Sequence, residues 1–135
     1  MSAFSDFTEN LFLNYFRGQN ITAPTTVYVG LASSATSDAM TGASVPELAN
    51  SDGYARVAVT FTAPSGGAIN EISNVAAVNF TATADWATAT HFFIVDSSTH
   101  GAGNMLAHAA LTQPVSILSG QTRQFPIGSL KVDLG

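Results

Sequence analysis

Hydrophobic and polar residues alternate along much of the chain after residue 24, which is the pattern of β-strands with one buried face. The alternation is clearest in residues 53–62 (GYARVAVTFT) and 130–134 (LKVDL). Successive side chains of a strand point to opposite sides, so one face should pack on a core while the other is wet or paired. In the first segment, one face carries Ala55, Val57, Val59 and Phe61, and the other carries Tyr54, Arg56, Ala58 and Thr60. In the second segment, one face carries Leu130, Val132 and Leu134, and the other carries Lys131 and Asp133.

Further short segments have the same character and are separated by turns rich in Gly, Pro and Ser. Residues 25–32 place Val27, Val29 and Leu31 inward. Residues 91–96 (HFFIVD) are apolar on both faces, as in a central strand covered from two sides. The other predicted strands are residues 69–72, 76–81, 104–111, 115–118 and 121–127. Together, about eight or nine short strands over residues 25–134 predict a mainly β fold, a single antiparallel β-sandwich forming one domain over residues 1–135.

The N-terminal segment has the periodicity of a helix. Its apolar residues recur at helical spacing and cover about half of the circumference: Phe4, Phe7, Leu11, Phe12, Tyr15 and Phe16. Asp6 and Glu9 have the spacing of a capping box. Arg17 would lie in the last turn, and Gly18 follows as a stop signal. The pattern therefore predicts one N-terminal helix over residues 5–17.

The helix and the segment after the first strand both offer apolar residues for contact with another subunit. With Leu13 on its remaining side, the helix is more apolar than a single packing partner requires. Residues 33–52 are irregular and rich in Ser, Ala and Thr, and loops of this length are often functional. One interpretation packs the helix in a groove of its own domain, and the other places it against a neighbouring subunit. The candidate interface residues are Phe12, Leu13, Phe16, Met40, Val45 and Leu48.

Charged residues are scarce, and this favours an assembled protein. They make up 10% of the chain, whereas hydrophobic residues reach 46%. An average soluble protein has about 25% charged residues, so few charges are present here to keep copies apart. The composition predicts a symmetric homo-oligomer, with a trimer as the first expectation, that buries much of its nominal surface. The alternative is a β-protein with a Ser- and Thr-rich exterior.

Charge and hydropathy also exclude several functions. The net charge is −5, and the four Lys and Arg residues are scattered, so no basic cluster is present to bind nucleic acid. No apolar run approaches the length of a membrane span, and the acidic Asp6 and Glu9 so close to the start argue against a signal peptide. The absence of cysteine excludes disulfides without identifying a compartment.

Motifs for catalysis, cofactors or metals are missing from the sequence. His91, His100 and His108 lack the partners at three or four residues expected of a helical metal site. Residues 101–103 (GAG) begin like a dinucleotide-binding motif, but no βαβ unit surrounds them. Asp85 beside Trp86 could form a sugar-stacking platform, although a tryptophan anchoring a loop explains the pair as well. No GxSxG motif exposes a nucleophilic serine. We therefore expect no catalytic, cofactor-binding or metal-binding residue, and no enzymatic activity.

The order of segments resembles a family of small tailed-bacteriophage virion proteins, often labelled tail fibre proteins. The resemblance is most specific in the strand containing GYAR, in the block EISNVAAVNFTATADWATATHFF, and in NML with the AL that follows it; it extends from about residue 11 to residue 134. None of these motifs is catalytic, so the resemblance implies no active-site residue. It implies a virion structural protein that is made without secretion in the cytoplasm of the bacterial host and is present in many copies.

The chain lacks a shaft such as a coiled coil, a collagen-like run or a β-helix repeat. We therefore prefer a capsid decoration or cement protein that binds the major capsid protein and stabilises the head. The alternative is a small tail-fibre or tail-tip protein that contacts tail proteins and takes part in host attachment. A glycan hydrolase, which would need two converging carboxylates, is the least favoured interpretation.

Overall fold

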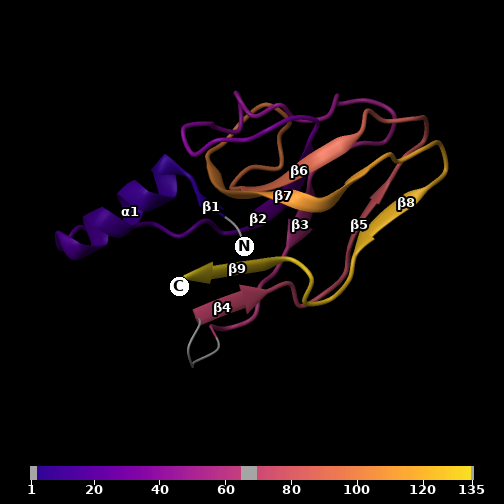
Figure 1. Ribbon diagram of the computed structural model, residues 1–135. Coiled ribbons are helices and arrows are strands. Elements are labelled where there is room, and N and C mark those ends of the chain that lie inside the picture. The colour runs from indigo at the N-terminus through magenta and orange to yellow at the C-terminus, as the bar shows by residue number, and fades with distance from the viewer. Residues whose placement is uncertain (1–2, 65–69, 135) are drawn as a thin grey trace.

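The computed structural model describes residues 3–64 and 70–134, which form antiparallel sheets and one short helix (Figure 1). The elements in chain order are β1 (Ala3–Phe4), α1 (Asp6–Phe16), β2 (Val27–Ala32), β3 (Val57–Val59), β4 (Asn70–Ser73), β5 (Val78–Thr81), β6 (Ala89–Val95), β7 (Met105–Val115), β8 (Thr122–Phe125) and β9 (Lys131–Leu134). This confirms the mainly β fold with an N-terminal helix.

The largest sheet has the strand order β1-β7-β6-β2-β3, and two ribbons, β4-β9 and β5-β8, lie beside it. One core fills the space between the large sheet and the β5-β8 ribbon. Its members from the two sides include Val29 and Phe92 of the sheet, and Phe80 and Phe125 of the ribbon. The arrangement is that of two β-layers packed face to face around apolar side chains.

A second apolar cluster lies on the other face of the large sheet. It contains Phe93 and Val95 of β6, Met105 of β7 and Val45 of the segment between β2 and β3. The predicted irregular segment, residues 33–52, therefore covers the sheet. Because β6 is buried on both faces, its near-continuous apolar sequence is explained, and the prediction of a central strand is confirmed.

Gly30 allows the close packing of this second cluster. A Cβ at Gly30 would lie 2.3 Å from the ring of Phe93, which pairs with Gly30 across β2 and β6. A real Cβ cannot approach an aromatic ring so closely, so the glycine makes room for the ring over the strand.

The predicted strand at residues 53–62 is shorter than expected, and its alternation breaks. Regular pairing covers only Val57–Val59. Tyr54 and Arg56 were assigned to the same face as Ala58 and Thr60, yet the first two are buried and the last two are exposed. Regular pairing begins only at Val57, so residues 54–56 do not continue the alternation of β3.

Two other strand predictions also need correction. Residues 104–111 and 115–118 are predicted as separate strands, but β7 continues through Pro114 to Val115, with register shifts against β6 between Ala89 and His91 and between Ile94 and Val95. Residues 116–118 then lie outside any strand. Proline is tolerated there because the shift leaves no regular ladder for it to interrupt. Residue 69, the start of another predicted strand, lies outside the described residues.

Candidate functional site

The N-terminus of α1 is fixed to the large sheet by one buried serine. The backbone N–H of Ser5 donates to the carbonyl of Leu106 (3.1 Å), and its hydroxyl donates to the carbonyl of Met105. The same hydroxyl oxygen accepts the N–H of Thr8 (3.2 Å), so Ser5 is the N-cap of the helix. The sequence had suggested Asp6 and Glu9 as the capping pair, which is wrong by one position. Gly18, with a φ of 75°, follows the helix as predicted.

Beyond this anchor, α1 leaves the body of the molecule and exposes its apolar residues. In Figure 1 the helix extends away from the sheets. No residue of α1 is classed as buried, and its contacts are mainly with β1 and β7. The exposed fractions are 37% for Phe12, 62% for Leu13, 66% for Tyr15 and 84% for Phe16. We call these four residues the α1 face.

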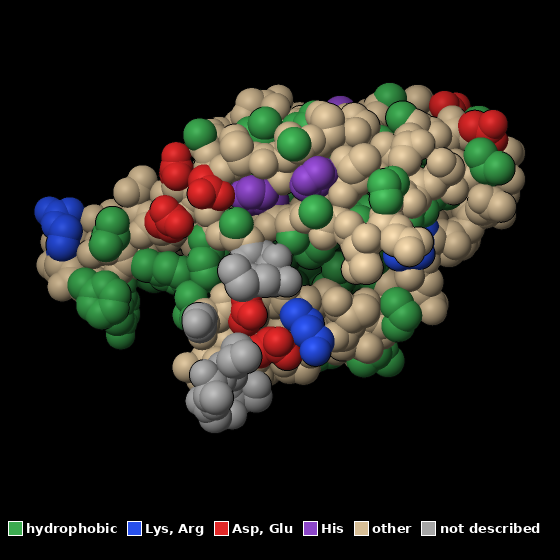
Figure 2. Space-filling model, viewed as in Figure 1, with side chains coloured by type: hydrophobic (Ala, Val, Ile, Leu, Met, Phe, Trp, Pro, Cys, Tyr) green, Lys and Arg blue, Asp and Glu red, His purple; other side chains and the backbone are tan. Residues whose placement is uncertain are grey.

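The α1 face continues onto the end of the β4-β9 ribbon. Phe12, Tyr15, Phe16 and Leu134 line one apolar groove. Phe12 and Leu134 also line a neighbouring groove with Phe4, Ile72 and Val132 on its apolar wall. Phe4 holds Phe12 in place through an edge-to-face ring contact with centroids 5.4 Å apart. The two grooves share Phe12 and Leu134, so they connect the helix with β9. Figure 2 shows hydrophobic side chains gathered on the lower side of the projecting helix.

The six predicted interface residues fall into two groups that the fold does not bring together. Phe12, Leu13 and Phe16 are exposed on α1. Val45 and Leu48 are buried in the two core clusters, and Met40 packs against the cluster that contains Val45. The apolar residues of the irregular segment pack into the chain's own core, with Val45 and Met40 on one face of the large sheet and Leu48 on the other. We therefore keep the interface hypothesis for the helix residues alone.

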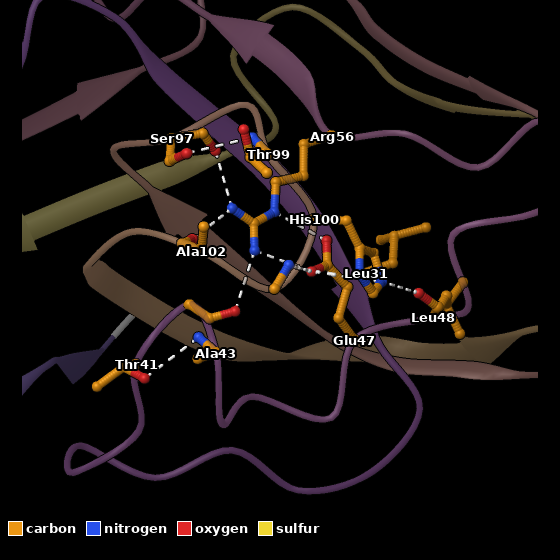
Figure 3. A network of polar contacts seen from close by, with 12 residues as sticks. Leu31, Thr41, Ala43, Glu47, Leu48, Arg56, Ser97, Thr99, His100 and Ala102 are labelled. Atoms are coloured by element: carbon orange, nitrogen blue, oxygen red, sulfur yellow. Dashed lines mark hydrogen bonds and ion pairs between the residues drawn. The ribbon is translucent and has the colours of Figure 1, made fainter.

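A buried polar network holds the irregular segment in place (Figure 3). Arg56 and Glu47 form a two-pronged ion pair, with Nε to Oε2 and Nη2 to Oε1 both at 2.9 Å. Their side chains are 0% and 3% exposed. The remaining guanidinium N–H groups donate to the carbonyls of Gly42 (3.1 Å), Ser97 (2.9 Å) and Ala102 (2.8 Å). All five donors of the guanidinium are thus used.

Tyr54 completes this network. Its hydroxyl donates to Glu47 Oε2 (2.7 Å) and accepts the N–H of Leu31 (3.0 Å). Burial, reinforced by the charge of Glu47, raises the pKa of Tyr54 far above its usual range. The donors of Arg56 and the hydroxyl of Tyr54 are thus all used within the chain. The GYAR motif is therefore explained by structure, because Tyr54 and Arg56 tie residues 42–47 to the loop at 97–102.

The three histidines have separate local partners. His91 contacts the hydroxyl of Thr90 (2.8 Å), and His100 contacts the carbonyl of Leu48 (2.8 Å). His108 bridges Thr36 (2.7 Å) and Asp38 (2.8 Å), which fixes the irregular segment to β7. Within residues 3–64 and 70–134, no group of three or more His, Cys, Asp or Glu side chains is placed to hold a metal ion.

The described part of the chain contains no helix long and apolar enough to cross a membrane. The pair Asp85 and Trp86 is also accounted for within the fold. The indole N–H of Trp86 donates to the carbonyl of Asp52 (2.8 Å), and Asp85 accepts the N–H of Ser119 (2.9 Å). Both residues hold loops together.

These observations describe a small β-protein whose buried polar groups fix its loops and whose projecting helix exposes several large apolar residues. The chain belongs to the family described as podophage GP4 fiber I protein gp80, whose model matches residues 3–133. No curated protein matches the chain. Family membership confirms the resemblance to small bacteriophage virion proteins and identifies the chain as a virion structural protein of a fibre family.

Proposed function

We propose that this protein is a non-enzymatic subunit of a phage tail fibre, which assembles through the α1 face and takes part in host attachment. It is made in the host cytoplasm and joins other tail proteins in the virion. The observation that carries the proposal is the exposure of the large apolar side chains of the α1 face on a protein whose exterior is otherwise rich in Ser and Thr.

The energetics of α1 support a partner. Isolated helices shorter than about 12–15 residues are marginal in water, and most helices in proteins are stabilised by packing of an apolar face. The helix spans only Asp6–Phe16 and packs mainly on β1 and β7 near its start. Its last turn, with Tyr15 and Phe16, lacks such cover. A partner that covers this turn would stabilise both the helix and the assembly.

A second copy of the chain is the occupant that we propose for the α1 face. Fully burying an aromatic side chain removes about 150–250 Å² from water. On that scale, the exposed fractions of the α1 face and Leu134 leave roughly 600 Å² per copy. A standard interface buries about 800 Å² per partner, so the patch approaches the size needed for self-association. A cyclic trimer would bring three equivalent faces together around one axis.

The family description favours a fibre over the capsid decoration protein preferred from the sequence. The absence of a shaft, which had favoured decoration, is compatible with a short subunit that attaches to longer tail proteins. Localisation in the particle tests the assignment. Antibody labelling of intact virions, viewed by electron microscopy, should mark the tail and leave the head unlabelled.

Particles that lack the protein give a second, independent test. They should retain their DNA on heating as normal particles do, but adsorb poorly to host cells. Particles that adsorb normally and release DNA at lower temperature would show that the decoration role is correct.

Light scattering on the purified chain tests self-association. Above micromolar concentration, the unmodified protein should have the mass of a trimer, and the Phe16→Ser variant should be monomeric because it loses the most exposed member of the α1 face. Val75→Ser is a matched control, since Val75 is exposed outside the α1 face. A monomeric unmodified protein would contradict self-association through the helix.

A further inference from the structure

A groove distinct from the α1 face runs along β7 and β8. One part of it, about 260 Å³, lies between residues 109–112 of β7 and residues 123–126 and 129–131. It continues past Pro114 and Ser116 toward Gln121, and Arg123 borders it along its whole length. Figure 2 shows this face hollowed between the upper body of the molecule and the lower ribbons, with basic side chains beside the hollow.

The guanidinium of Arg123 is held by an aromatic ring and has no anionic partner among the described residues. It lies over the ring of Phe125, with its Cζ 5.4 Å from the ring centroid. Among the described residues it forms no hydrogen bond or ion pair. Stacking on a buried ring fixes the plane of the group, so less freedom is lost when its N–H groups meet a ligand.

The chain's other three cations are already engaged. Arg56 is buried on Glu47, Arg17 donates to Asn14 Oδ1 (2.8 Å), and Lys131 lies 3.6 Å from Glu71. Lys131 also borders the part of the groove beside residues 109–112, where its exposed pair with Glu71 contributes little. No Asp or Glu of the described residues lines the groove, although the chain carries nine acidic residues. The groove is thus locally basic on an acidic protein.

Neutral polar side chains complete the lining. Thr112, Gln113 and Gln124 line the groove, and their side chains form no hydrogen bond with another described residue. Such groups suit the hydroxyls of a sugar, while the stacked Arg123 suits a carboxylate or phosphate through two parallel hydrogen bonds. The geometry points to a binding site for an anionic saccharide, with Arg123 as the residue that recognises the charge.

Calorimetric titration of the full chain at low salt tests this site. The probes are trigalacturonic acid, which carries carboxylates, glucose 6-phosphate, which carries a phosphate, and maltotriose, which is neutral. We expect at least one anionic probe to bind and maltotriose to bind at least about tenfold more weakly, because it lacks the charge that Arg123 would meet. Which anionic probe binds identifies the anion as a carboxylate or a phosphate.

Variants then locate the binding. Arg123→Gln should weaken the anionic probe at least about tenfold, and Arg123→Lys should not restore it fully, since lysine lacks the planar fork. Arg17→Gln removes an equal charge on α1 and should leave binding unchanged. Absence of binding by both anionic probes, or equal binding by Arg123→Gln, would overturn the proposal and leave Arg123 as a charge that guards the edge of β8.

Chemical-shift mapping on the unmodified protein covers the case in which Arg123→Gln does not fold. Shifts confined to residues 109–116 and 121–131 would support the groove. Shifts confined to α1 would refute it. Saccharide binding and self-association can be tested separately, because Phe16 does not line the groove. The Phe16→Ser variant should therefore still bind the anionic probe.

Discussion

The network around Arg56 and the α1 face differ in how completely the chain itself supplies the contacts that their side chains need. Around Arg56, every donor of a buried charge meets an acceptor of the same chain. On α1, large apolar side chains meet little of the chain beyond Phe4 and their own neighbours. Polar groups, which would be expected outside, are sealed in, and apolar groups, which would be expected inside, are exposed.

This difference separates what the chain completes alone from what it leaves for a partner. A buried charge must be matched within the chain, because removing one member leaves the other uncompensated. An exposed apolar face costs less in the monomer and gains when it is covered. Substitutions in the Arg56 network should therefore mainly lower the stability of the fold, whereas substitutions in the α1 face should mainly weaken assembly.

The largest effect is expected from Glu47→Ala. The substitution leaves the guanidinium of Arg56 buried without its carboxylate, which should lower the free energy of unfolding by about 3–5 kcal/mol. Urea denaturation followed by circular dichroism measures the change. The double variant Glu47→Leu with Arg56→Met removes both charges and should recover much of the loss. A loss as large in the double variant as in the single one would contradict the account.

Asn74→Ala should have the next largest effect. Asn74 is fully buried, and its amide donates to the carbonyls of Ala76 (2.8 Å) and Pro126 (3.0 Å) while accepting the N–H of Leu130 (2.9 Å). Its removal leaves these backbone groups unsatisfied, and we expect a loss of about 1–3 kcal/mol in the same denaturation experiment. Asn79→Ala, at an exposed position of β5, is the control and should change little.

Stability should also fall at alkaline pH because of Tyr54. Its pKa is raised in the folded state, so above its usual pKa the unfolded chain loses a proton that the folded chain keeps. The contribution is complete below about pH 10 and declines above it by up to about 1.4 kcal/mol per pH unit. Denaturation curves from pH 8 to 11 measure the decline. Tyr54→Phe should be less stable at pH 8 but should show a flatter dependence, and an equal slope would exclude Tyr54 as the cause.

The smallest effect on folding is expected from Phe16→Ser. Because the side chain is almost fully exposed, the free energy of unfolding of the monomer should change by less than about 0.5 kcal/mol. Denaturation at protein concentrations too low for self-association measures the free energy of unfolding of the monomer alone. Phe80→Ala, in the core, is the contrast, with an expected loss of about 3–5 kcal/mol. A comparable loss for Phe16→Ser would mean that the α1 face belongs to the core.

The sequence was sufficient for elements in which local pattern and burial agree. The apolar run at residues 91–96 predicted a strand covered on both faces, and β6 has that position. The spacing of aromatic residues before Gly18 predicted the helix, and α1 lies within one residue of each predicted end. In both cases the period of the hydrophobic residues follows directly from the geometry of the element.

Prediction failed where distant partners change the environment of a residue. Arg56 looks like a surface residue in an alternating strand, and only the fold brings Glu47 and three loop carbonyls to it. Val45 and Leu48 looked available for a partner, because nothing local shows that their segment covers the large sheet. The groove beside Arg123 was also missed, since β7 and β8 follow one another in the chain but pair in different sheets, and only the fold shows the open space between them.

The end of β9 gives the α1 face a consequence for local dynamics. The β4-β9 ribbon has two strands of four residues each, and two-stranded ribbons are marginal without further packing. Leu134 lines the same groove as Phe12 and Phe16, so a partner seated on the helix would also clamp the ribbon. Backbone amides of β4 and β9 would then exchange with deuterium more slowly in the assembled fibre than in the free subunit. Assembly would thus lower the hydrogen-exchange rates of the β4-β9 ribbon, which carries none of the four residues of the α1 face.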